Sequence, residues 1–466
     1  MIEPGQRTGV ETPPTLPDTT PSSAASKRAH RKLLAAGLVG SSIEWYDFFL
    51  YGTAAALVFP HVFFPDASAL MGTLLSFSTF WAGFVARPLG GLLAGHFGDR
   101  YGRKPVVVVC LLAMGIATFA IGCLPSTGSI GVLAPILLVT LRFVQGIACG
   151  GQWGGIVLLL TESAGPKKRG FAGTFGQMGV PLGLIMGNLV FLAATAALST
   201  DAFLSWGWRV PFLASALLFP VVLYIHTRVE DSPEFRELQA ETTAKRKAPA
   251  VAQAPLAEAV KQHWRTILLG CGLLAGTNSL FYVSIAGLLS YGTAELGMNR
   301  NALLAISLIS SGLLTAVILW AGALSDRIGR RPLILIGGAG IALWAFPFFG
   351  LINTASVLAV FVAVAVGAAM QALTYGPLAA FMGELFAPRV RYSGASLAYQ
   401  LAAITISGGT PFIMTWIIAE TGSTTGVSLF LMAMGLITVF SGWKLRETNT
   451  PAVRNDPEAV PGAQLY

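Results

Sequence analysis

Four ionisable residues of this chain lie near the centres of long apolar segments, where charge is rare. Glu44 and Asp47 are three positions apart and Tyr51 follows one turn later, so the three share one face if the segment is helical. Arg87 and Arg142 occupy the middle of two other apolar segments. A charge inside a bilayer costs at least about 2.5 kcal/mol on insertion scales, so each of these residues is a candidate for function.

The two residue types suggest complementary chemistry. A carboxyl group facing a cavity can take up a proton or a cationic group, and a guanidinium group stays protonated and matches the shape of a carboxylate. We therefore expect Glu44 and Asp47 to exchange the coupling proton, and Arg87 and Arg142 to bind a carboxylate anion. The alternative is that the carboxylates form static ion pairs with the arginines, which fix the packing of the helices.

Neutral polar residues inside apolar segments form a second group of candidates. Gln145 and Gln152 follow Arg142 at offsets that place all three along one stripe of a helix. Tyr51 in the first half of the chain belongs to the same group. In the second half the group consists of Asn278, Tyr282, Gln371, Tyr375 and Gln400. We expect these residues to bind a polar ligand, although each is as well suited to an interhelical hydrogen bond.

The composition excludes a soluble enzyme, a coiled coil and a disordered chain. Of the 466 residues, 54% are hydrophobic and only 11% are charged. A membrane-spanning helix needs about 20 apolar residues. Twelve apolar runs satisfy this length or approach it: 33–59, 69–97, 106–124, 130–160, 171–198, 210–224, 267–289, 303–324, 333–351, 357–385, 393–419 and 427–443. The sequence therefore predicts an all-α membrane protein.

Basic residues indicate how the chain is oriented. All but four of the 30 lie on one side of the predicted membrane, while Arg209 and Arg300 lie on the other side and Arg87 and Arg142 lie within it. Because basic residues accumulate in cytoplasmic loops, we expect both termini in the cytoplasm. The net charge of +8 is explained by this pattern, so no nucleic-acid partner is expected.

A long polar interruption divides the twelve runs into six and six. The predicted organisation is a disordered cytoplasmic tail (1–32), a six-helix bundle (33–228), a cytoplasmic linker (229–264), a second six-helix bundle (265–446) and a cytoplasmic C-terminal tail (447–466). The halves also repeat, because the loop from Gly95 to Pro105 matches the loop from Gly322 to Pro332. Repeated halves around a central site are typical of an alternating-access carrier.

Several motifs resemble the major facilitator superfamily. They are Asp99-Arg100-x-Gly102-Arg103-Lys104 in the first repeated loop and Arg142-x-x-Gln145-Gly146 in the fourth run. Within it, Glu44-Trp45-Tyr46-Asp47-Phe48 and Arg87-Pro88-Leu89-Gly90-Gly91 resemble the metabolite:proton symporter branch, whose members carry α-ketoglutarate, citrate, shikimate or proline and betaine. One position departs from that branch, because Gln152 stands where relatives usually have a glutamate that can take up a proton.

The resemblance implies the major facilitator fold and a gate at the repeated loops. Asp99 would contact the start of the eleventh helix near Arg391, and Asp326 would contact the start of the fifth helix near Arg169. The alternative is a tight turn with solvated charges. The expected gate residues are Asp99, Arg100, Arg103, Glu162, Arg169, Asp326, Arg327, Arg330, Glu384 and Arg391.

The resulting hypothesis is a monomeric secondary transporter of a bacterial inner membrane that imports a small organic acid together with protons. The expected partners are an organic anion, protons and membrane lipid, with no cofactor, no metal and no enzymatic activity. A closer rival is an importer of a zwitterion such as proline or betaine, in which Glu44 and Asp47 would bind the ammonium group beside Trp45 or Tyr51. A proton-driven exporter of amphipathic compounds is less consistent with two central arginines. A receptor or an intramembrane hydrolase lacks a supporting constellation in this sequence.

Overall fold

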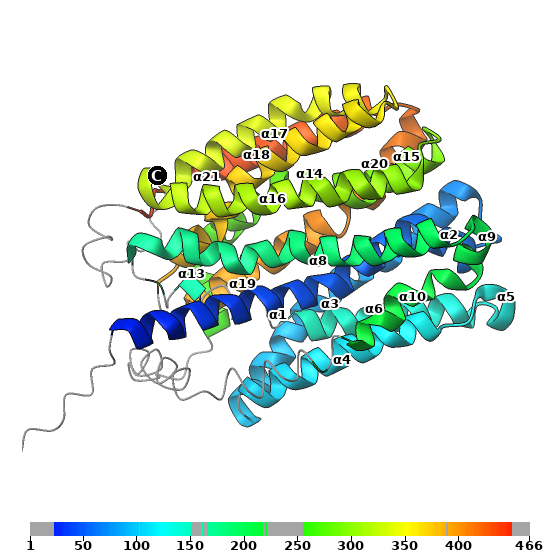
Figure 1. Ribbon diagram of the computed structural model, residues 1–466. Helices are drawn as coiled ribbons and strands as arrows, with labels where there is room; N and C mark the ends of the chain where they lie inside the picture. Colours follow the sequence, from blue (N-terminus) through cyan, green and yellow to red (C-terminus); the bar gives the residue numbers. More distant parts are fainter. Residues whose placement is uncertain are drawn as a thin grey trace, which may run out of the picture.

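The computed structural model describes residues 23–101, 103–150, 160–161, 164, 166–217, 220, 255–387 and 390–449. Within these residues the regular structure is entirely helical. The rods form two groups that lie side by side, with earlier helices in one group and later helices in the other (Figure 1). The predicted fold of twelve transmembrane helices in two six-helix bundles is confirmed.

Five long helices build most of the first bundle, and short helical pieces join them. The long helices are α1 (Ser23–Leu57), α3 (Ala69–Tyr101), α4 (Arg103–Cys123), α6 (Leu133–Cys149) and α8 (Arg169–Ala197). The short pieces are α2 (Phe59–Val62), α5 (Thr127–Ile130), η1 (Pro166–Lys168), α9 (Thr200–Ala202), η2 (Phe203–Gly207), α10 (Arg209–Ala214) and η3 (Ser215–Leu217), of which the last three form the sixth rod.

The second bundle contains four continuous helices and two interrupted rods. The continuous helices are α16 (Arg300–Ile328), α17 (Arg330–Ile352), α18 (Val357–Glu384) and α21 (Thr425–Lys444). One interrupted rod consists of α13 (Pro255–Leu273), α14 (Ala275–Tyr282), η5 (Val283–Gly287) and α15 (Leu288–Ala294), and the other of α19 (Arg391–Ala402), η6 (Ala403–Ser407) and α20 (Thr410–Thr421). Both interruptions, η5 and η6, are π-helical turns, which occur often at functional sites.

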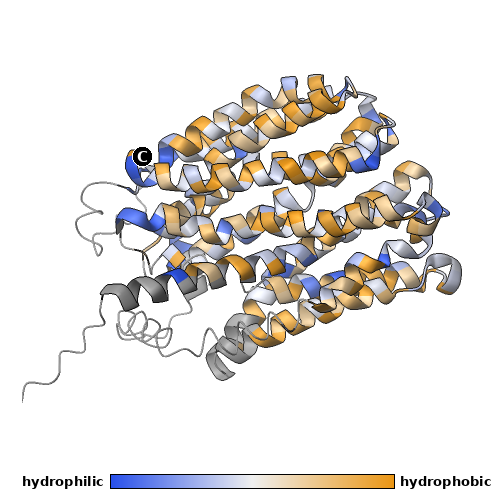
Figure 2. Ribbon diagram, viewed as in Figure 1, coloured by the Kyte–Doolittle hydropathy of each residue, from blue (hydrophilic) through white to orange (hydrophobic). Residues whose placement is uncertain are grey.

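The distribution of apolar residues on the surface is that expected of a protein embedded in a lipid bilayer. Apolar residues cover the lengths of the rods, and hydrophilic residues gather toward their ends (Figure 2). Among the described residues, eight helices are long and apolar enough to cross a membrane by composition alone, and two shorter apolar helices, Val108–Cys123 and Leu133–Cys149, accompany them. The start of α1, the start of α8, the turn between α16 and α17 and the end of α21 lie at one end of the molecule, called here the loop end (Figure 1).

Several boundaries predicted from hydropathy are wrong. Helix α1 begins at Ser23, so ten residues of the predicted disordered tail are helical, and α13 begins at Pro255, ten residues inside the predicted linker. The fourth run is predicted to begin at residue 130, but its helix α6 begins at Leu133, because Gly131, with a φ of 61°, separates α5 from α6. The eleventh run is not one continuous helix, because η6 interrupts it. The length of an apolar run indicates only the part of a helix that lies in lipid. The helix itself continues past the run wherever the flanking polar residues favour helical structure.

Glycines allow α3 and α6 to touch backbone to backbone. A Cβ atom at Gly90 would collide with the carbonyl oxygen of Ile147, and one at Gly150 would collide with the carbonyl oxygen of Arg87. Small residues of this kind bring membrane helices close enough for dense packing without a hydrophobic driving force. This contact fixes the rotation of α3, and therefore the direction in which Arg87 leaves its helix.

Helix α8 joins the two bundles. It packs against α1 within its own bundle and against α16 and α18 of the other. Near the loop end, Gly170 of α8 faces the backbone of Gly322 of α16 at close range. The candidate site lies between the bundles that α8 connects.

Candidate functional site

A small cavity lies between the two bundles. Its walls come from α1, α3 and α8 on one side and from α14, α16, α18, α19 and η6 on the other. The lining residues are Trp45, Phe84, Arg87, Val180, Pro181, Asn278, Phe281, Tyr282, Leu314, Gln371, Tyr375, Tyr399, Ala403 and Ser407. A concave site of mixed aromatic and polar character at a domain interface is typical of a small-molecule site.

Arg87 is the one charged residue among the described residues that line this cavity. Its side chain is 2% exposed, and its Cζ atom lies 4.5 Å from the ring centre of Phe48, 4.8 Å from that of Phe84 and 5.3 Å from that of Trp45. Two of its nitrogens, Nε and Nη2, are buried without a hydrogen-bond partner. The aromatic rings stabilise the cation, but they leave its donors available to an anion.

Arg142 does not line the cavity, contrary to expectation. Its side chain is 1% exposed, and its Cζ atom lies 4.3 Å from the ring centre of Phe48 and 4.2 Å from that of Tyr51. Its Nη1 donates to Oε1 of Gln145 at 3.2 Å, while Nε and Nη2 have no hydrogen-bond partner. The absence of a side chain at Gly83 makes room for this guanidinium group, since a Cβ there would lie 2.5 Å from Nε. Arg142 is thus a buried cation behind the cavity wall.

Gln145 and Tyr51 also lie away from the cavity. Nε2 of Gln145 donates to Oγ1 of Thr118 at 2.6 Å, and the Tyr51 hydroxyl donates to Oγ1 of Thr79 at 2.7 Å. Both side chains are buried within the first bundle. In this geometry both residues make contacts between helices, and their role in ligand binding stays a prediction.

The two carboxyl groups of α1 are buried and are not paired with either arginine. Glu44 is 3% exposed and accepts a hydrogen bond from the Cys149 thiol at 3.1 Å. Asp47 is 4% exposed, and its Oδ1 has no hydrogen-bond partner. All four ionisable residues belong to the described part of the chain, and within that part no ion pair joins a carboxyl group to Arg87 or Arg142. The static ion pairs considered as an alternative are therefore absent from this state.

The second bundle supplies neutral polar groups, as expected. Asn278, Tyr282, Gln371 and Tyr375 all line the cavity. Gln400 does not, because its Nε2 crosses the interface and donates to the carbonyl oxygen of Gly150 at 3.0 Å. The first bundle thus contributes the charge of Arg87 to the cavity walls, and the second contributes neutral polar groups.

Several lining residues were not expected from the sequence. Tyr399 and Ser407 line the cavity beside the predicted residues, and Nδ2 of Asn278 donates to Oγ of Ser407 at 2.7 Å. Phe84 and Phe281 add aromatic surface. Tyr399 is of the same type as the predicted Tyr282 and Tyr375 and could have been named with them, whereas serine and phenylalanine residues also fill ordinary helix contacts and carry no signal of their own.

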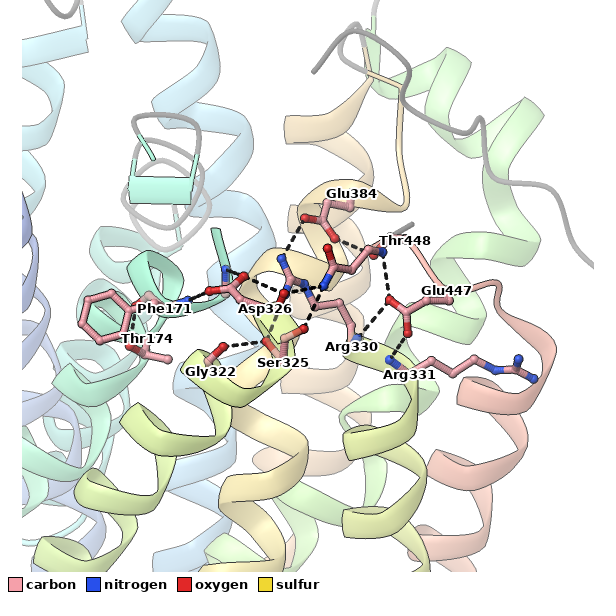
Figure 3. A network of polar contacts seen from close by, with 12 residues as sticks. Phe171, Thr174, Gly322, Ser325, Asp326, Arg330, Arg331, Glu384, Glu447 and Thr448 are labelled. Atoms are coloured by element: carbon pink, nitrogen blue, oxygen red, sulfur yellow. Dashed lines mark hydrogen bonds and ion pairs between the residues drawn. The ribbon is translucent and has the colours of Figure 1, made fainter. Parts of the chain in front are cut away.

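Polar residues join the two bundles at the loop end (Figure 3). The carboxylate of Asp326 accepts hydrogen bonds from the backbone N–H groups of Gly170 and Phe171, each at 2.9 Å, at the start of α8. A carboxylate at a helix N-terminus satisfies free donors and interacts favourably with the helix dipole. The predicted position of Asp326 beside the fifth helix is confirmed, and its action as a gate stays a prediction.

Arg330 lies at the centre of the same network and has no exposed surface. Its Nη1 contacts Oδ1 of Asp326 at 2.8 Å, and its Nη2 contacts Oε1 of Glu384 at 3.4 Å (Figure 3). Buried charges survive when they are paired and hydrogen-bonded, as here. Asp326, Arg330 and Glu384 are all among the expected gate residues, and the structure brings them together.

The residues after α21 complete this network, which the sequence did not anticipate. Glu447 accepts hydrogen bonds from the backbone N–H groups of Arg330 at 2.9 Å and Arg331 at 2.8 Å, where α17 begins. Thr448 donates to Glu384, and Nδ2 of Asn449 donates to the carbonyl oxygens of Ser325 at 3.0 Å and Asp326 at 3.1 Å. The predicted C-terminal tail therefore begins as a packed segment, because its first residues serve the loop between α16 and α17.

Other predicted gate residues are only partly described. The side chains of Asp99, Arg100 and Arg103 lie outside the described part of the chain, as do Gln152 and Glu162. Arg169 begins α8 and Arg327 lies in the last turn of α16. Nε of Arg391 donates to the carbonyl oxygen of Phe386 at 3.4 Å. The predicted contact between Asp99 and the eleventh helix stays a prediction.

The two bundles also meet at the opposite end. Oγ1 of Thr195 donates to Oδ1 of Asn301 at 2.8 Å, and Nδ2 of Asn188 donates to Oγ of Ser307 at 3.0 Å. Nε1 of Trp81 donates across the interface to the carbonyl oxygen of Ile404 at 2.8 Å. Contacts between the bundles thus exist on both sides of the cavity.

Comparisons with known proteins agree with this geometry. Residues 33–451 match the family model described as "Sugar (and other) transporter". The inner membrane metabolite transport protein YhjE of Escherichia coli (strain K12) is 40% identical, with 90% of this chain and 95% of the relative covered. The shikimate transporter of the same organism is 38% identical over 90% and 95% of the two chains, and the proline/betaine transporter of Salmonella typhimurium is 31% identical over 92% and 86%.

The solved structures give the same fold. The partially occluded inward open conformation of the xylose transporter XylE from E. coli covers 91% of this chain and 99% of its own, with a TM-score of 0.67 at 18% identity. Another XylE structure, titled as a proton:xylose symporter of the major facilitator superfamily, has a TM-score of 0.65 at 19% identity. This chain is therefore a membrane transporter of small molecules and not an enzyme, and it belongs to the sugar (and other) transporter family within the major facilitator superfamily.

Proposed function

We propose that this protein imports a small organic acid together with one or more protons by alternating access. The observation that carries the proposal is Arg87, a buried cation that lines the central cavity with two donor nitrogens unpartnered and no ion pair to a carboxyl group of the described residues. A buried, unpaired charge is costly, so a site that keeps one gains most from a ligand of opposite charge. A carboxylate that accepts from both nitrogens meets this need.

The coupling proton is assigned to Glu44 and Asp47. Each is a buried carboxyl group without a counter-ion, and such a group is held at lowest cost in its neutral form. Glu44 also lies within electrostatic range of Arg87. A protonated Glu44 leaves Arg87 free for the substrate, whereas a deprotonated Glu44 competes with the substrate for the same cation. Proton and substrate then bind together and leave together.

The loop end is assigned to the cytoplasm, and both termini with it, in a bacterial inner membrane. The basic residues of the chain support this orientation, because they gather on the side of the repeated loops. In the proposed cycle the Asp326 contact with α8 closes this end while the other end opens to receive substrate. Protons are the only coupling species in the proposal, and the carrier acts as a monomer without a cofactor.

A zwitterion importer is the second candidate. Trp45, Phe84 and Phe281 line the cavity, and aromatic faces of this kind can hold a quaternary ammonium group. A relative named as a proline/betaine transporter also supports the zwitterion importer as the second candidate function. An exporter of amphipathic compounds is less consistent with a cavity whose one described charge is an unpaired arginine.

Uptake into proteoliposomes tests the proposal. The panel contains α-ketoglutarate, citrate, shikimate, a short monocarboxylate and glycine betaine, with and without an inward proton gradient. We expect gradient-stimulated uptake of an organic acid, lost in Arg87→Gln and retained in Lys261→Gln, which removes an exposed cation that does not line the cavity. Uptake of betaine alone would favour the zwitterion importer, and efflux of an amphipathic dye in place of uptake would favour the exporter.

Variants of the carboxyl groups separate coupling from binding. In Glu44→Gln and Asp47→Asn we expect exchange of internal for external substrate to continue while accumulation driven by the proton gradient is lost. Asparagine and glutamine keep the size of the side chain but cannot release a proton. Undiminished gradient-driven accumulation in both variants would exclude these residues as the coupling site.

A further inference from the structure

We propose that the cavity selects a singly charged carboxylate whose other polar groups are neutral, and that it discriminates against dicarboxylates and zwitterions. This inference deepens the proposed function and rests on it. It follows from how the charges and neutral polar groups are distributed over the cavity walls.

The first step is the number of charges that the walls can match. Arg87 is the one charged side chain among the described residues that line the cavity. Its unpartnered nitrogens are Nε and Nη2, which lie on the same edge of the planar guanidinium group. One edge accepts one carboxylate through two parallel hydrogen bonds. The cavity therefore offers one matched position for one negative charge.

The second step concerns the charges that the walls leave unmatched. A second carboxylate would be buried against neutral groups, and the ammonium group of a zwitterion would find no carboxylate on the described walls. Glu44 already accepts from Cys149, and the rings of Trp45 and Phe84 already hold the Arg87 guanidinium group within 5.3 Å. Because a buried unpaired charge is disfavoured, both ligand classes bind less well than a monoanion.

The third step concerns the far wall. Asn278, Gln371, Tyr282, Tyr375, Tyr399 and Ser407 all come from the second bundle and carry amide or hydroxyl groups. Groups of this kind donate to and accept from hydroxyl and carbonyl substituents without requiring a charge. Some of these groups already pair with one another, since Nδ2 of Asn278 donates to Oγ of Ser407 and Tyr375 hydrogen-bonds Tyr399. A ligand that adds hydrogen bonds to the remaining donors and acceptors of the wall binds better than one that cannot. The walls thus also favour a hydroxylated anion over an apolar one.

A matched series on one six-membered ring tests the inference. The probes are 3,4,5-trihydroxycyclohexane-1-carboxylate, cyclohexane-1,4-dicarboxylate, piperidine-2-carboxylate and cyclohexanecarboxylate. Uptake of each labelled compound into proteoliposomes is measured at neutral external pH, where every carboxyl group is ionised. We expect the trihydroxy monoanion to enter at least about tenfold faster than the dicarboxylate and the zwitterion, the factor that a difference of about 1.4 kcal/mol produces.

The outcomes distinguish the inference from the proposed function. Uptake of the dicarboxylate as fast as that of the trihydroxy monoanion overturns the inference and leaves organic-acid import standing. Uptake of the piperidine compound alone overturns both in favour of the zwitterion importer. If no compound in the series or in the organic-acid panel enters, both proposals are refuted.

A variant of the far wall gives a second readout. In Gln371→Leu we expect the preference for the trihydroxy ring over the plain ring to fall about tenfold. The matched control is Gln262→Leu, which changes an exposed glutamine of α13. An unchanged preference in Gln371→Leu, with the protein folded, would show that the far wall does not read the neutral substituents.

Discussion

Replacing Asp326 by asparagine should open the loop end of the carrier. Asp326 joins the two bundles there, because its two carboxylate oxygens accept from the N–H groups of Gly170 and Phe171 at the start of α8. Its side chain is only 8% exposed, so solvent screens the contact weakly. Asparagine keeps one acceptor oxygen, loses the charge and turns an N–H₂ group toward donors.

The size of the effect follows from these contacts. A hydrogen bond to a charged group contributes about 1.5–3 kcal/mol, and a carboxylate at a helix N-terminus adds about 0.3–1 kcal/mol. Losing one such bond and the charge should therefore cost the closed loop end about 2–3 kcal/mol, which raises the ratio of open to closed molecules about 30- to 150-fold. The remaining contacts of Arg330 with Glu384 keep the second bundle folded.

Alkylation of a buried cysteine measures this ratio. Thr174 has no exposed surface and packs against Gly322 across the interface, so Thr174→Cys reacts only when the loop end opens. The reaction rate of this cysteine, followed by mass spectrometry, should rise at least about tenfold in Asp326→Asn. The control is Asp201→Asn, the same change at an exposed position of α9 at the opposite end. An unchanged rate in a folded Asp326→Asn protein would refute the view that this carboxylate holds the bundles together.

Three further substitutions probe packing and charge. Gly90→Ala should destabilise the protein by about 1–3 kcal/mol or prevent folding, because the added Cβ meets a backbone carbonyl of α6. The control Gly312→Ala, whose Cβ meets no neighbour, should leave the stability unchanged, and thermal unfolding in detergent distinguishes the two variants. Glu447→Gln should lower the unfolding temperature by the loss of about 1–2 kcal/mol, since two N–H groups at the start of α17 lose a charged acceptor, and the exposed Glu295→Gln is its control. Phe48→Leu should raise the substrate concentration for half-maximal uptake about tenfold, with Phe48→Tyr much less affected, because leucine removes the ring that contacts both buried guanidinium groups; equal behaviour of the two variants would contradict this reading.

The fold could be predicted from the sequence because hydropathy alone decides which segments lie in lipid. The interruptions inside helices could not. The π-helical turns η5 and η6 follow Tyr282 and Ala402 within apolar runs that read as continuous. Such turns depend on how neighbouring helices fill space, and the local sequence does not encode that packing.

The residues of the site could be predicted only in part, because helix packing also decides which side chains reach the cavity. Arg87 and Arg142 look equivalent in the sequence, since each is an arginine near the centre of an apolar run. Which one reaches the cavity depends on the rotation of its helix about its own axis, and the glycine contacts between α3 and α6 set that rotation. The same ambiguity separates Tyr399, which lines the cavity, from its neighbour Gln400, which does not.

The loop-end network illustrates a different limit. Asp326 and Arg330 stand in a repeated motif, so their position could be predicted from the symmetry of the halves. Glu447 has no counterpart in that motif and follows the last apolar run, where a solvated tail is the usual expectation. Its contacts arise because α17 begins with free N–H groups that need acceptors, and the end of α21 lies beside them.

Phe48 lies between Arg87 and Arg142, and its neutral ring contacts both guanidinium groups. Two guanidinium groups in a low-dielectric interior repel each other, and neither forms an ion pair with a carboxylate in the part of the chain that the structure describes. The ring centre of Phe48 lies 4.5 Å from the Cζ atom of Arg87 and 4.3 Å from that of Arg142, so its negative faces stabilise both cations. Arg87 is then held at the cavity wall, where an anion can reach its free donors, and Arg142 is held behind the wall, where no ligand can. A single anionic ligand therefore meets a single accessible cation, even though the helices carry two.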